Sequence, residues 1–301
     1  MRLAVTGGTG FVGRHLIDQA LDAGHEVCAL TRRPQPERPD LTWIEGALDV
    51  ADALARLVER ADAVIHVAGV TNAPDLAAFR AGNVAGTQAI VAAAHTARVP
   101  RFVHVSSLAA REPHLSMYGA SKAEAEAIVM ASGLNWAMVR PPAVYGPGDM
   151  DMLDTFRAAN LRLALTPPPG RLSVIHAADL AALLLALAGD DHPGAVFEPD
   201  DGKAGGWTHA EFFGQAMGAA VGKRVLTLAL PRPLLTLAAR ADRLLRGSGA
   251  RLTLDRVSYM CHPNWTIDPA RRPEPALWQP RIATADGLAE TARWYRAQGL
   301  L

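Results

Sequence analysis

The sequence has little lysine, little cysteine and no excess of charge of either sign. Its 301 residues include 30 basic and 30 acidic side chains, and only three of the basic ones are lysine: Lys122, Lys203 and Lys223. A formal charge of zero argues against a broad basic face, so we expect no nucleic-acid partner. The two cysteines, Cys28 and Cys261, belong to no CxxC motif or Cys/His cluster. We therefore expect neither a disulfide scaffold nor a metal site.

Long apolar runs are also missing. The stretch LAALLLALAG from Leu180 is too short to cross a bilayer, and the one from Leu226 is broken by Pro231 and Pro233. The N-terminus has no signal-peptide pattern, so we expect a cytoplasmic protein without a membrane span. Half of the residues are hydrophobic, which excludes wholesale disorder. The length allows one large domain or two smaller ones.

The first half of the chain alternates short apolar runs with Ala- and Leu-rich runs. We expect strands at 3–6, 26–30, 41–44, 63–67, 102–106 and 136–139, and helices near 11–23, 50–60, 80–98 and 118–132. Strands that are apolar throughout and separated by helices indicate a parallel sheet buried on both faces. The sequence therefore predicts an α/β protein with a doubly wound, Rossmann-like parallel sheet.

The pattern changes after residue 140, where proline and glycine interrupt the apolar segments. LSVIH and the apolar run after it indicate one more strand and helix, and GAVFEP indicates a last strand. We assign residues 1–150 and 171–200 to a dinucleotide-binding Rossmann domain. Residues 151–170 and 201–301 are assigned to a smaller, mostly helical substrate-binding domain at the C-terminal edge of the sheet, where such sheets bind ligands.

A glycine-rich loop, TGGTGFVG, directly follows the first predicted strand. Gly8, Gly10 and Gly13 satisfy the GxGxxG spacing, and Gly7, Gly10 and Gly13 satisfy its GxxGxxG variant. Glycines let backbone N–H groups approach a pyrophosphate, and the next helix aims its N-terminal dipole at that anion. The loop predicts a dinucleotide cofactor; the alternative is a glycine-rich turn without a ligand.

The end of the second strand indicates which cofactor binds. An acidic residue there would bind the ribose 2′-hydroxyl of NAD, whereas arginine suits a 2′-phosphate. Thr31 stands at this position and is followed by Arg32 and Arg33. Our hypothesis is that NADP(H) is preferred and NAD(H) is possible; the alternative is a solvated basic loop.

Tyr118 and Lys122 lie one helical turn apart in MYGASK. With so few tyrosines and lysines, a YxxxK match is expected by chance only roughly 0.04 times per chain, so the motif is informative. A nearby ammonium favours the phenolate, which lets the tyrosine exchange a proton with a carbonyl or alcohol near neutral pH. Ser107, at the end of FVHVSS, is placed to polarise the same oxygen.

Together these motifs resemble the extended short-chain dehydrogenase/reductases of the NAD-dependent epimerase/dehydratase superfamily. TGGTGFVG resembles their cofactor loop, VIHVAG their fourth strand, and VSS with YGASK their catalytic set, while RPPAVYGPGD and VIHAADLA resemble later signatures. The similarity covers roughly residues 1–200. It implies that Tyr118 is the acid/base, that Lys122 is its partner and ribose anchor, and that Ser107 completes the set.

The resemblance also implies a cofactor site and a homodimer, the latter formed by the helices near 80–98 and 118–132. The implied cofactor residues are Gly7, Gly10, Phe11, Val12, Gly13, Arg32, Arg33, Leu48, Val67, Ala68, Gly69, Tyr118, Lys122 and Val144. Asn83 corresponds either to a helix asparagine of the family or to a plain structural contact. Arg171 does not align with the diphosphate-binding arginine of sugar-nucleotide enzymes, which weakens that alternative.

The leading hypothesis is an NADP(H)-dependent oxidoreductase that interconverts a carbonyl and a secondary alcohol on a small, fairly apolar substrate. The alternatives are a nucleotide-sugar epimerase or dehydratase, and a non-catalytic NADP(H)-binding regulatory or assembly protein. The segment from Pro233 has leucines at helical spacing with arginines opposite. It indicates a packing helix of the substrate domain or a contact with a membrane surface or lipid-like substrate.

Overall fold

The computed structural model describes residues 1–247, 250 and 252–301. Two compact units make up the chain: the first is Met1–Pro141, Leu180–Glu198 and Pro273–Trp278, and the second is Pro142–Asp179, Pro199–Arg272 and Gln279–Leu301. Residues 142–150 and 171–179, which we assigned to the first domain, lie in the second unit. The reason is that their strands pair with each other and not with the large sheet.

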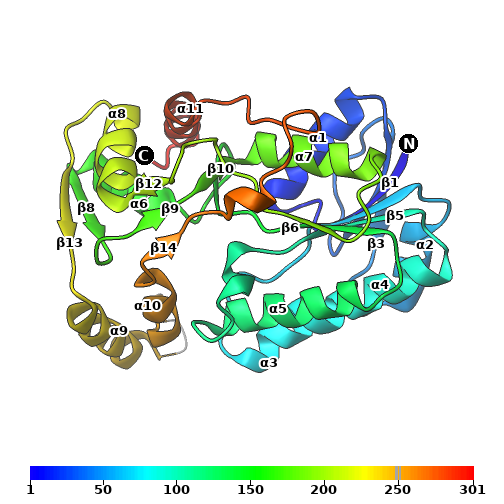
Figure 1. Ribbon diagram of the computed structural model, residues 1–301, viewed down its shortest axis with the longest axis horizontal. Coiled ribbons are helices and arrows are strands. Elements are labelled where there is room, and N and C mark those ends of the chain that lie inside the picture. The colour runs from blue at the N-terminus through cyan, green and yellow to red at the C-terminus, as the bar shows by residue number, and fades with distance from the viewer. Residues whose placement is uncertain (248–249, 251) are drawn as a thin grey trace. The chain divides into compact units, whose positions relative to one another are not determined.

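The first unit is built on a seven-stranded sheet (Figure 1). Its strands are β1 (Arg2–Thr6), β2 (Glu26–Thr31), β3 (Leu41–Glu45), β4 (Ala63–His66), β5 (Arg101–Val105), β6 (Trp136–Val139) and β11 (Ala195–Phe197). The spatial order is β11-β6-β5-β4-β1-β2-β3, and every pairing is parallel. The predicted doubly wound sheet is confirmed, including its last strand in GAVFEP.

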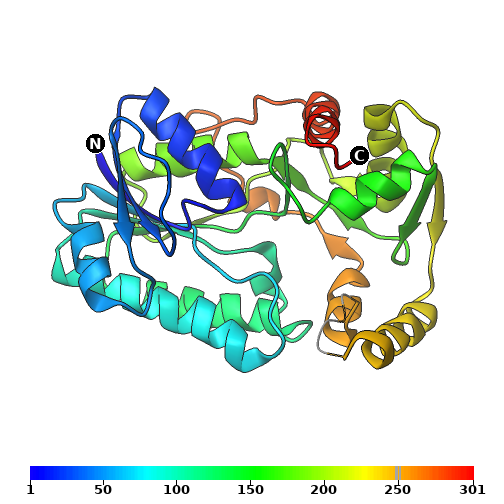
Figure 2. The same ribbon diagram turned by 180° about the vertical axis from the view of Figure 1, so that it is seen from behind.

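Helices cover both faces of this sheet. They are α1 (Phe11–Asp22), α2 (Ala51–Val58), α3 (Leu76–Phe79), the π-helical η1 (Arg80–Ala85), α4 (Gly86–Thr96), the 3-10 helix η2 (Leu108–Arg111), α5 (Met117–Met130) and α7 (Ala177–Gly189). α1 and α7 lie on one face, and α2, α4 and α5 on the other (Figures 1 and 2). On the second face Leu57, Ile90 and Phe102 are completely buried in one cluster. Coverage on both sides explains why the strands are apolar throughout.

The second unit combines short strands with helices. Its strands are β7 (Ala143–Tyr145), β8 (Leu163–Thr166), β9 (Arg171–Leu172), β10 (Val174–His176), β12 (Trp207–Thr208), β13 (Leu226–Ala229) and β14 (Asn264–Trp265). Its helices are α6 (Leu153–Asn160), the π-helical η3 (Ala210–Ala216), α8 (Met217–Val221), α9 (Arg232–Arg246), α10 (Leu254–Met260), the 3-10 helix η5 (Pro269–Arg271) and α11 (Thr284–Ala297). The strands form the sets β10-β7, β12-β9-β14 and β13-β8. The strand expected in LSVIH is therefore present, as β10.

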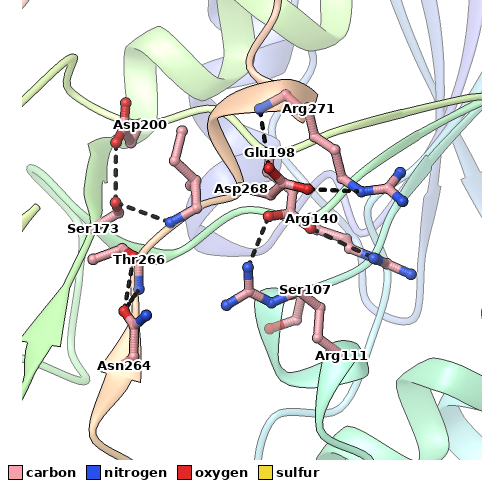
Figure 3. A network of polar contacts seen from close by, with 12 residues as sticks. Ser107, Arg111, Arg140, Ser173, Glu198, Asp200, Asn264, Thr266, Asp268 and Arg271 are labelled. Atoms are coloured by element: carbon pink, nitrogen blue, oxygen red, sulfur yellow. Dashed lines mark hydrogen bonds and ion pairs between the residues drawn. The ribbon is translucent and has the colours of Figure 1, made fainter. Parts of the chain in front are cut away.

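Buried carboxylates join distant segments of the second unit. Asp200 accepts a hydrogen bond from Ser173 Oγ at 3.0 Å and from the Arg272 guanidinium at 2.9 Å; the first of these contacts is drawn in Figure 3. Asp179, at the start of α7, accepts from the backbone N–H groups of Arg281 and Ile282, both at 3.1 Å. These contacts hold the segment that precedes α11 against Asp200 and the start of α7.

The core of the first unit predicts a clear contrast between buried and exposed leucines. Replacing Leu57→Ala removes a fully buried side chain from α2 and should lower the free energy of unfolding by about 2–5 kcal/mol. Leu244→Ala is the matched control, because that side chain is 87% exposed, and its effect should stay within about 0.5 kcal/mol. Urea unfolding followed by circular dichroism measures both. Equal losses in the two variants would contradict the assignment of the core.

Candidate active site

The glycine loop after β1 lies directly against the chain that follows β4. Gly7 has a positive φ of 75°, and a Cβ there would lie 2.6 Å from the backbone N of Ala68. A Cβ at Gly13 would lie 2.1 Å from the carbonyl oxygen of Gly7, which also accepts from Gly10 N at 2.9 Å. Gly7 and Gly13 therefore tolerate no side chain, and the loop forms a bare backbone cradle.

The start of α1 completes this cradle. Gly10 is the N-cap residue of a helix of 12 residues and supplies no side-chain hydrogen bond. Phe11 and Val12 form the first turn and are half-buried, with the Phe11 ring edge-on to His15 at 5.6 Å. A helix N-terminus whose amides lack a side-chain cap attracts anions through its N–H groups and its dipole. The geometry fits the pyrophosphate of a dinucleotide.

Lys122 is a buried cation beside the carboxyl end of strand β5. Its side chain is on α5, its residue is 4% exposed, and its Nζ donates to the carbonyl oxygen of Val105 at 2.8 Å. A Cβ placed on Gly69, just beyond β4, would lie 3.7 Å from that Nζ. Burial lowers the pKa of Lys122 to about 8, although the nearby Glu126 carboxylate acts to raise it. The structure thus brings Lys122 together with Gly69.

A chain of buried polar groups connects β1 with η1. Thr6 Oγ1 lies 2.6 Å from His66 Nδ1, and His66 Nε2 lies 3.0 Å from Thr87 Oγ1. Because the Thr87 hydroxyl donates its proton to the carbonyl oxygen of Asn83 at 2.6 Å, His66 Nε2 must carry a proton and its Nδ1 must accept. Burial, with Lys122 nearby, lowers the pKa of His66 to about 3. The ring is therefore neutral at pH 7.

Asn83 ties the cofactor edge of the sheet to α5. Its Oδ1 accepts from Val70 N at 2.6 Å, and its Nδ2 donates to Val70 O at 3.0 Å and to Ser121 Oγ at 2.9 Å. Ser121 in turn donates to the carbonyl oxygen of Tyr118 at 2.8 Å. Of the two interpretations of Asn83, these contacts support the plain structural contact, because the residue braces both the turn after β4 and the start of α5.

Ser107 and Tyr118 lie on two segments that pack closely together. Ser107 is the N-cap of η2, where its Oγ accepts from Ala109 N at 3.2 Å. Tyr118 is in the first turn of α5, half-buried, with its ring 6.1 Å from that of Phe79. A Cβ at Gly119 would lie 2.7 Å from the carbonyl oxygen of Ala109. A glycine at this position therefore lets the segment carrying Ser107 approach the one carrying Tyr118 and Lys122.

Four buried or half-buried charges form a network next to these segments; Arg140, Glu198 and Arg111 of this network are drawn in Figure 3. Arg140 donates to both oxygens of Glu126, at 2.8 and 2.6 Å, and lies 3.4 Å from Glu198. Glu198 also pairs with Arg111 of η2 at 3.0 Å. Ser106 Oγ donates to Glu126 at 2.5 Å. With two positive and two negative groups, the network is neutral, and it links β5, β6, β11, η2 and α5.

Glu126, Arg140 and Glu198 are not among the site residues predicted from the sequence. Glu126 lies one helical turn after Lys122, a spacing visible in the sequence. Its pairing with Arg140, and that of Arg140 with Glu198 58 positions further on, depend on the order of strands in the folded sheet. The spacing of four residues between Lys122 and Glu126 is thus the feature of the sequence that points to this charge network.

The two arginines after β2 are exposed to solvent. Thr31 Oγ1 donates to the carbonyl oxygen of Arg33 at 2.6 Å and accepts from its backbone N–H at 3.2 Å, which closes a tight turn. Within the described part of the chain, the guanidinium groups of Arg32 and Arg33 have no acidic partner. They are available to a phosphate, as the hypothesis of NADP(H) preference requires.

Three other predicted cofactor residues, Val67, Leu48 and Val144, lie in three different segments of the chain. Val67 N donates to Thr6 O at 3.2 Å, which fixes the turn after β4. Leu48 is half-buried, and a Cβ on Gly86 would lie 2.7 Å from its Cδ1. Val144 is in β7 of the second unit, so its contact with a nicotinamide stays a prediction.

The described residues contain neither a candidate metal centre nor a candidate membrane span. None of their His, Cys, Asp and Glu side chains gather in a group of three or more that could hold a metal ion. None of the helices formed by residues 1–247, 250 and 252–301 has the length and apolar character needed to cross a bilayer.

Comparison with known proteins now gives the family. The model of the NAD dependent epimerase/dehydratase family matches residues 3–197, which is more than half of the chain. The chain belongs to this family. The predicted resemblance to its extended short-chain dehydrogenase/reductases is confirmed.

Relatives extend the match over the whole chain. A ceramide reductase of Caulobacter vibrioides is 36% identical over 311 residues, covering 99% of this chain and 96% of its own length. A 2-alkyl-3-oxoalkanoate reductase of Stenotrophomonas maltophilia is 29% identical and covers 96% and 97%. Bordetella bronchiseptica WbmG, solved with NAD, has a TM-score of 0.76 at 22% identity, covering 100% of this chain and 95% of that one, a likeness of fold. This member of the NAD-dependent epimerase/dehydratase family is an NAD(P)-dependent oxidoreductase.

The burial of Lys122 predicts a stability effect with a defined pH dependence. A lysine whose pKa falls from 10.5 to about 8 on folding costs about 3 kcal/mol below pH 8, where both states are protonated. That cost declines as the pH rises from 8 towards 10.5, because the unfolded chain then binds more protons than the folded one. Lys122→Met should therefore raise the free energy of unfolding by about 2 kcal/mol at pH 7, allowing for the lost hydrogen bond to Val105, and by almost nothing at pH 10.

Urea unfolding at the two pH values measures this difference. The matched control is Lys203→Met, because the ammonium of Lys203 is partly exposed and pairs with Glu211 at 3.6 Å. Its stability should change little at either pH. A Lys122→Met variant less stable than wild type at pH 7 would contradict the cost assigned to the buried ammonium.

Proposed function

We propose that this enzyme interconverts a ketone and a secondary alcohol on an apolar, lipid-like substrate and that it prefers NADP(H). The observation that carries the proposal is the buried Lys122, one helical turn from Tyr118 and beside the bare backbone of Gly69. A cation held next to a phenol and a cofactor cradle suits proton transfer to or from an oxygen. The first unit would be the cofactor domain and the second the substrate domain.

Each catalytic residue has a distinct role in this proposal. The backbone cradle of Gly7, Gly10 and Gly13 would hold a nicotinamide dinucleotide, which would supply a hydride to the carbonyl carbon when bound. Tyr118 donates its phenolic proton to the carbonyl oxygen, so the ketone gains one hydride and one proton and becomes an alcohol. Lys122 stabilises the phenolate that remains, and Ser107 donates a hydrogen bond to the same oxygen. The reverse direction runs through the same groups.

The proposed substrate class follows from the relatives and from one contact. The relatives reported above are named for a ceramide and for 2-alkyl-3-oxoalkanoates, and we infer a ketone on a long alkyl chain, resembling an oxidised ceramide. For a nucleotide-sugar enzyme, a free arginine would be needed at the diphosphate. The Arg171 guanidinium donates instead to the carbonyl oxygens of Gly205 and Gly206, at 2.6 and 3.1 Å. This contact favours the lipid-like ketone over a sugar nucleotide.

The remaining hypotheses concern catalysis, location and assembly. A non-catalytic, regulatory protein has no need of the Tyr118 and Lys122 pair, so its retention favours an enzyme. We propose a cytoplasmic location, which the free thiols of Cys28 and Cys261 support. We also propose a homodimer through α4 and α5, whose alanine-rich surfaces allow helices to approach closely.

Removing the phenolic proton of Tyr118 tests the reaction. Tyr118→Phe should lower turnover by about 10²- to 10⁴-fold, the usual worth of a positioned acid, while the dissociation constant for NADPH changes little. The assay follows NADPH consumption with short-chain analogues of an oxo-ceramide and of a 2-alkyl-3-oxoalkanoate. Tyr259→Phe is the matched control, since that ring stacks on Trp265 at 4.6 Å in the second unit, and its turnover should stay near that of wild type. Near-normal turnover of Tyr118→Phe would refute the assigned role.

The arginine pair tests the cofactor preference. The double variant Arg32→Ala/Arg33→Ala removes two donors for a 2′-phosphate and should weaken NADPH binding by about 10- to 100-fold, with little change for NADH. Fluorescence titration gives both dissociation constants. Arg38→Ala is the matched control, because Arg38 is an exposed arginine of the same loop that pairs with Asp18 at 2.7 Å. Equal dissociation constants of the wild-type enzyme for NADPH and NADH would contradict the proposed preference for NADP(H).

A further inference from the structure

Helix α9 of the second unit has two apolar stripes, and only one of them is packed. Leu235 and Ala239, one turn apart, are 6% and 1% exposed and pack with Val257 of α10. This small buried cluster is the contact by which α9 packs in its unit, as predicted for a packing helix of the substrate domain. The remaining leucines of α9 have no place in it.

The second stripe of α9 faces solvent. Leu234, Leu237, Leu244 and Leu245 are 47%, 63%, 87% and 83% exposed. At 100° per residue these four leucines, with Ala241, fall within about 100° of the helix circumference. They form a continuous aliphatic stripe that is exposed among the described residues of the second unit. A stripe of this width on a helix that already packs through another face calls for a partner.

More uncovered leucines lie just before α9. In the two-stranded pair β8–β13, Leu163 is opposite Leu226 and Leu165 is opposite Leu228, so all four share one face. That face is exposed, whereas Ala164 between the leucines of β8 is buried. The large side chains thus point to solvent and the small one points to the interior, the reverse of an ordinary half-buried strand. Neighbouring large apolar side chains that are exposed on one face are typical of an interaction site.

The polar part of α9 is strongly basic. Arg232, Arg240, Arg243 and Arg246 are all exposed, and the only acidic residue of the helix, Asp242, pairs with Arg246 at 3.2 Å. Four arginines against one aspartate give the helix a net charge of +3 in a chain whose formal charge is zero. A cationic polar face opposite a broad leucine stripe is the pattern of helices that lie in a membrane interface.

A surface depression on α9 has the chemistry of a lipid headgroup site. It is shallow and open to solvent, and its lining residues are Arg232, Pro233, Thr236, Leu237 and Arg240. Arg232 and Arg240 can bind phosphate oxygens through their guanidinium groups, while the residues between them offer an apolar floor to the start of an acyl chain.

We propose that α9 docks this enzyme on an anionic lipid bilayer. Leu234, Leu237 and Leu244 enter the boundary between headgroups and acyl chains, and the arginines bind lipid phosphates. A bilayer suits the stripe better than a protein does, because the stripe holds only leucine and alanine and lacks the Trp and Tyr anchors of protein interfaces. The inference goes beyond the proposed function, since it concerns where the enzyme works and not which bond it reduces.

Vesicle flotation of the full-length protein tests the proposal. Wild type should float with phosphatidylcholine vesicles that contain phosphatidylglycerol, and weakly with phosphatidylcholine alone. Leu237→Glu/Leu244→Glu should weaken binding by about tenfold or more, because it places charges in the apolar stripe. Arg240→Gln/Arg243→Gln should also lose about tenfold or more on the anionic vesicles, since each arginine near such a surface is worth about fivefold. Val50→Glu and Met130→Glu, exposed apolar residues of the first unit, are matched controls that should bind as wild type.

Two further measurements separate the possible failures. Turnover of a short-chain, water-soluble ketone should be unchanged in the α9 variants, which shows that they fold; loss of turnover on Tyr118→Phe concerns the proposed function alone. Wild type that does not float, or α9 variants that float as wild type, would overturn docking through α9. Docking is equally overturned if Leu237→Glu/Leu244→Glu leaves flotation unchanged but turns a dimer into a monomer in sedimentation equilibrium. The stripe would then be an interface between two copies of the chain.

Discussion

The burial of one ammonium group, that of Lys122, governs the arrangement of the first unit around the site. A buried charge is costly unless hydrogen bonds and opposite charges surround it. The carbonyl oxygen of Val105 and the nearby carboxylate of Glu126 provide both. His66 and His104, stacked 5.3 Å apart, add no second positive charge, because burial lowers the pKa of each and keeps the rings neutral. The ammonium is therefore stabilised enough to stay charged at pH 7, while burial brings the pKa of Lys122 down to about 8.

Compensation by Glu126 creates a second requirement, because that carboxylate is itself buried. The fork of Arg140 neutralises it through two hydrogen bonds, and Glu198 then balances Arg140. The last partner, Arg111, lies in η2, four residues after Ser107. The charge of Lys122 is thus connected, by alternating charges, to the segment that carries Ser107. This connection explains how α5 and η2 keep one relative position.

How much of this was predictable from the sequence depends on the range of each interaction. The glycine loop, the YxxxK pair and the strand pattern are local, and the structure has the predicted strands and the tight approach of Gly7 to Ala68. The pairing of Arg140 with Glu198 spans 58 positions and arises only when β11 aligns with β6. The domain boundary has the same cause: β10 is as apolar as a strand of the main sheet, but its partner is β7. Apolar patterns predict a strand without predicting its neighbour.

The scarcity of lysine now has a physical interpretation. Of the 30 basic residues, less the three lysines, 27 are arginines, and an arginine keeps its charge under all ordinary conditions. Arg101 of the first unit is 4% exposed, and although burial lowers its pKa, its guanidinium is basic enough to stay charged and donates hydrogen bonds to Leu187 O and Asn135. Permanent charge also suits the polar face of α9. Only a lysine can be brought by burial to a pKa of about 8, as Lys122 is. The chain therefore has arginine at most of its cationic positions, and lysine at the buried position 122, where burial brings the pKa of the ammonium to about 8.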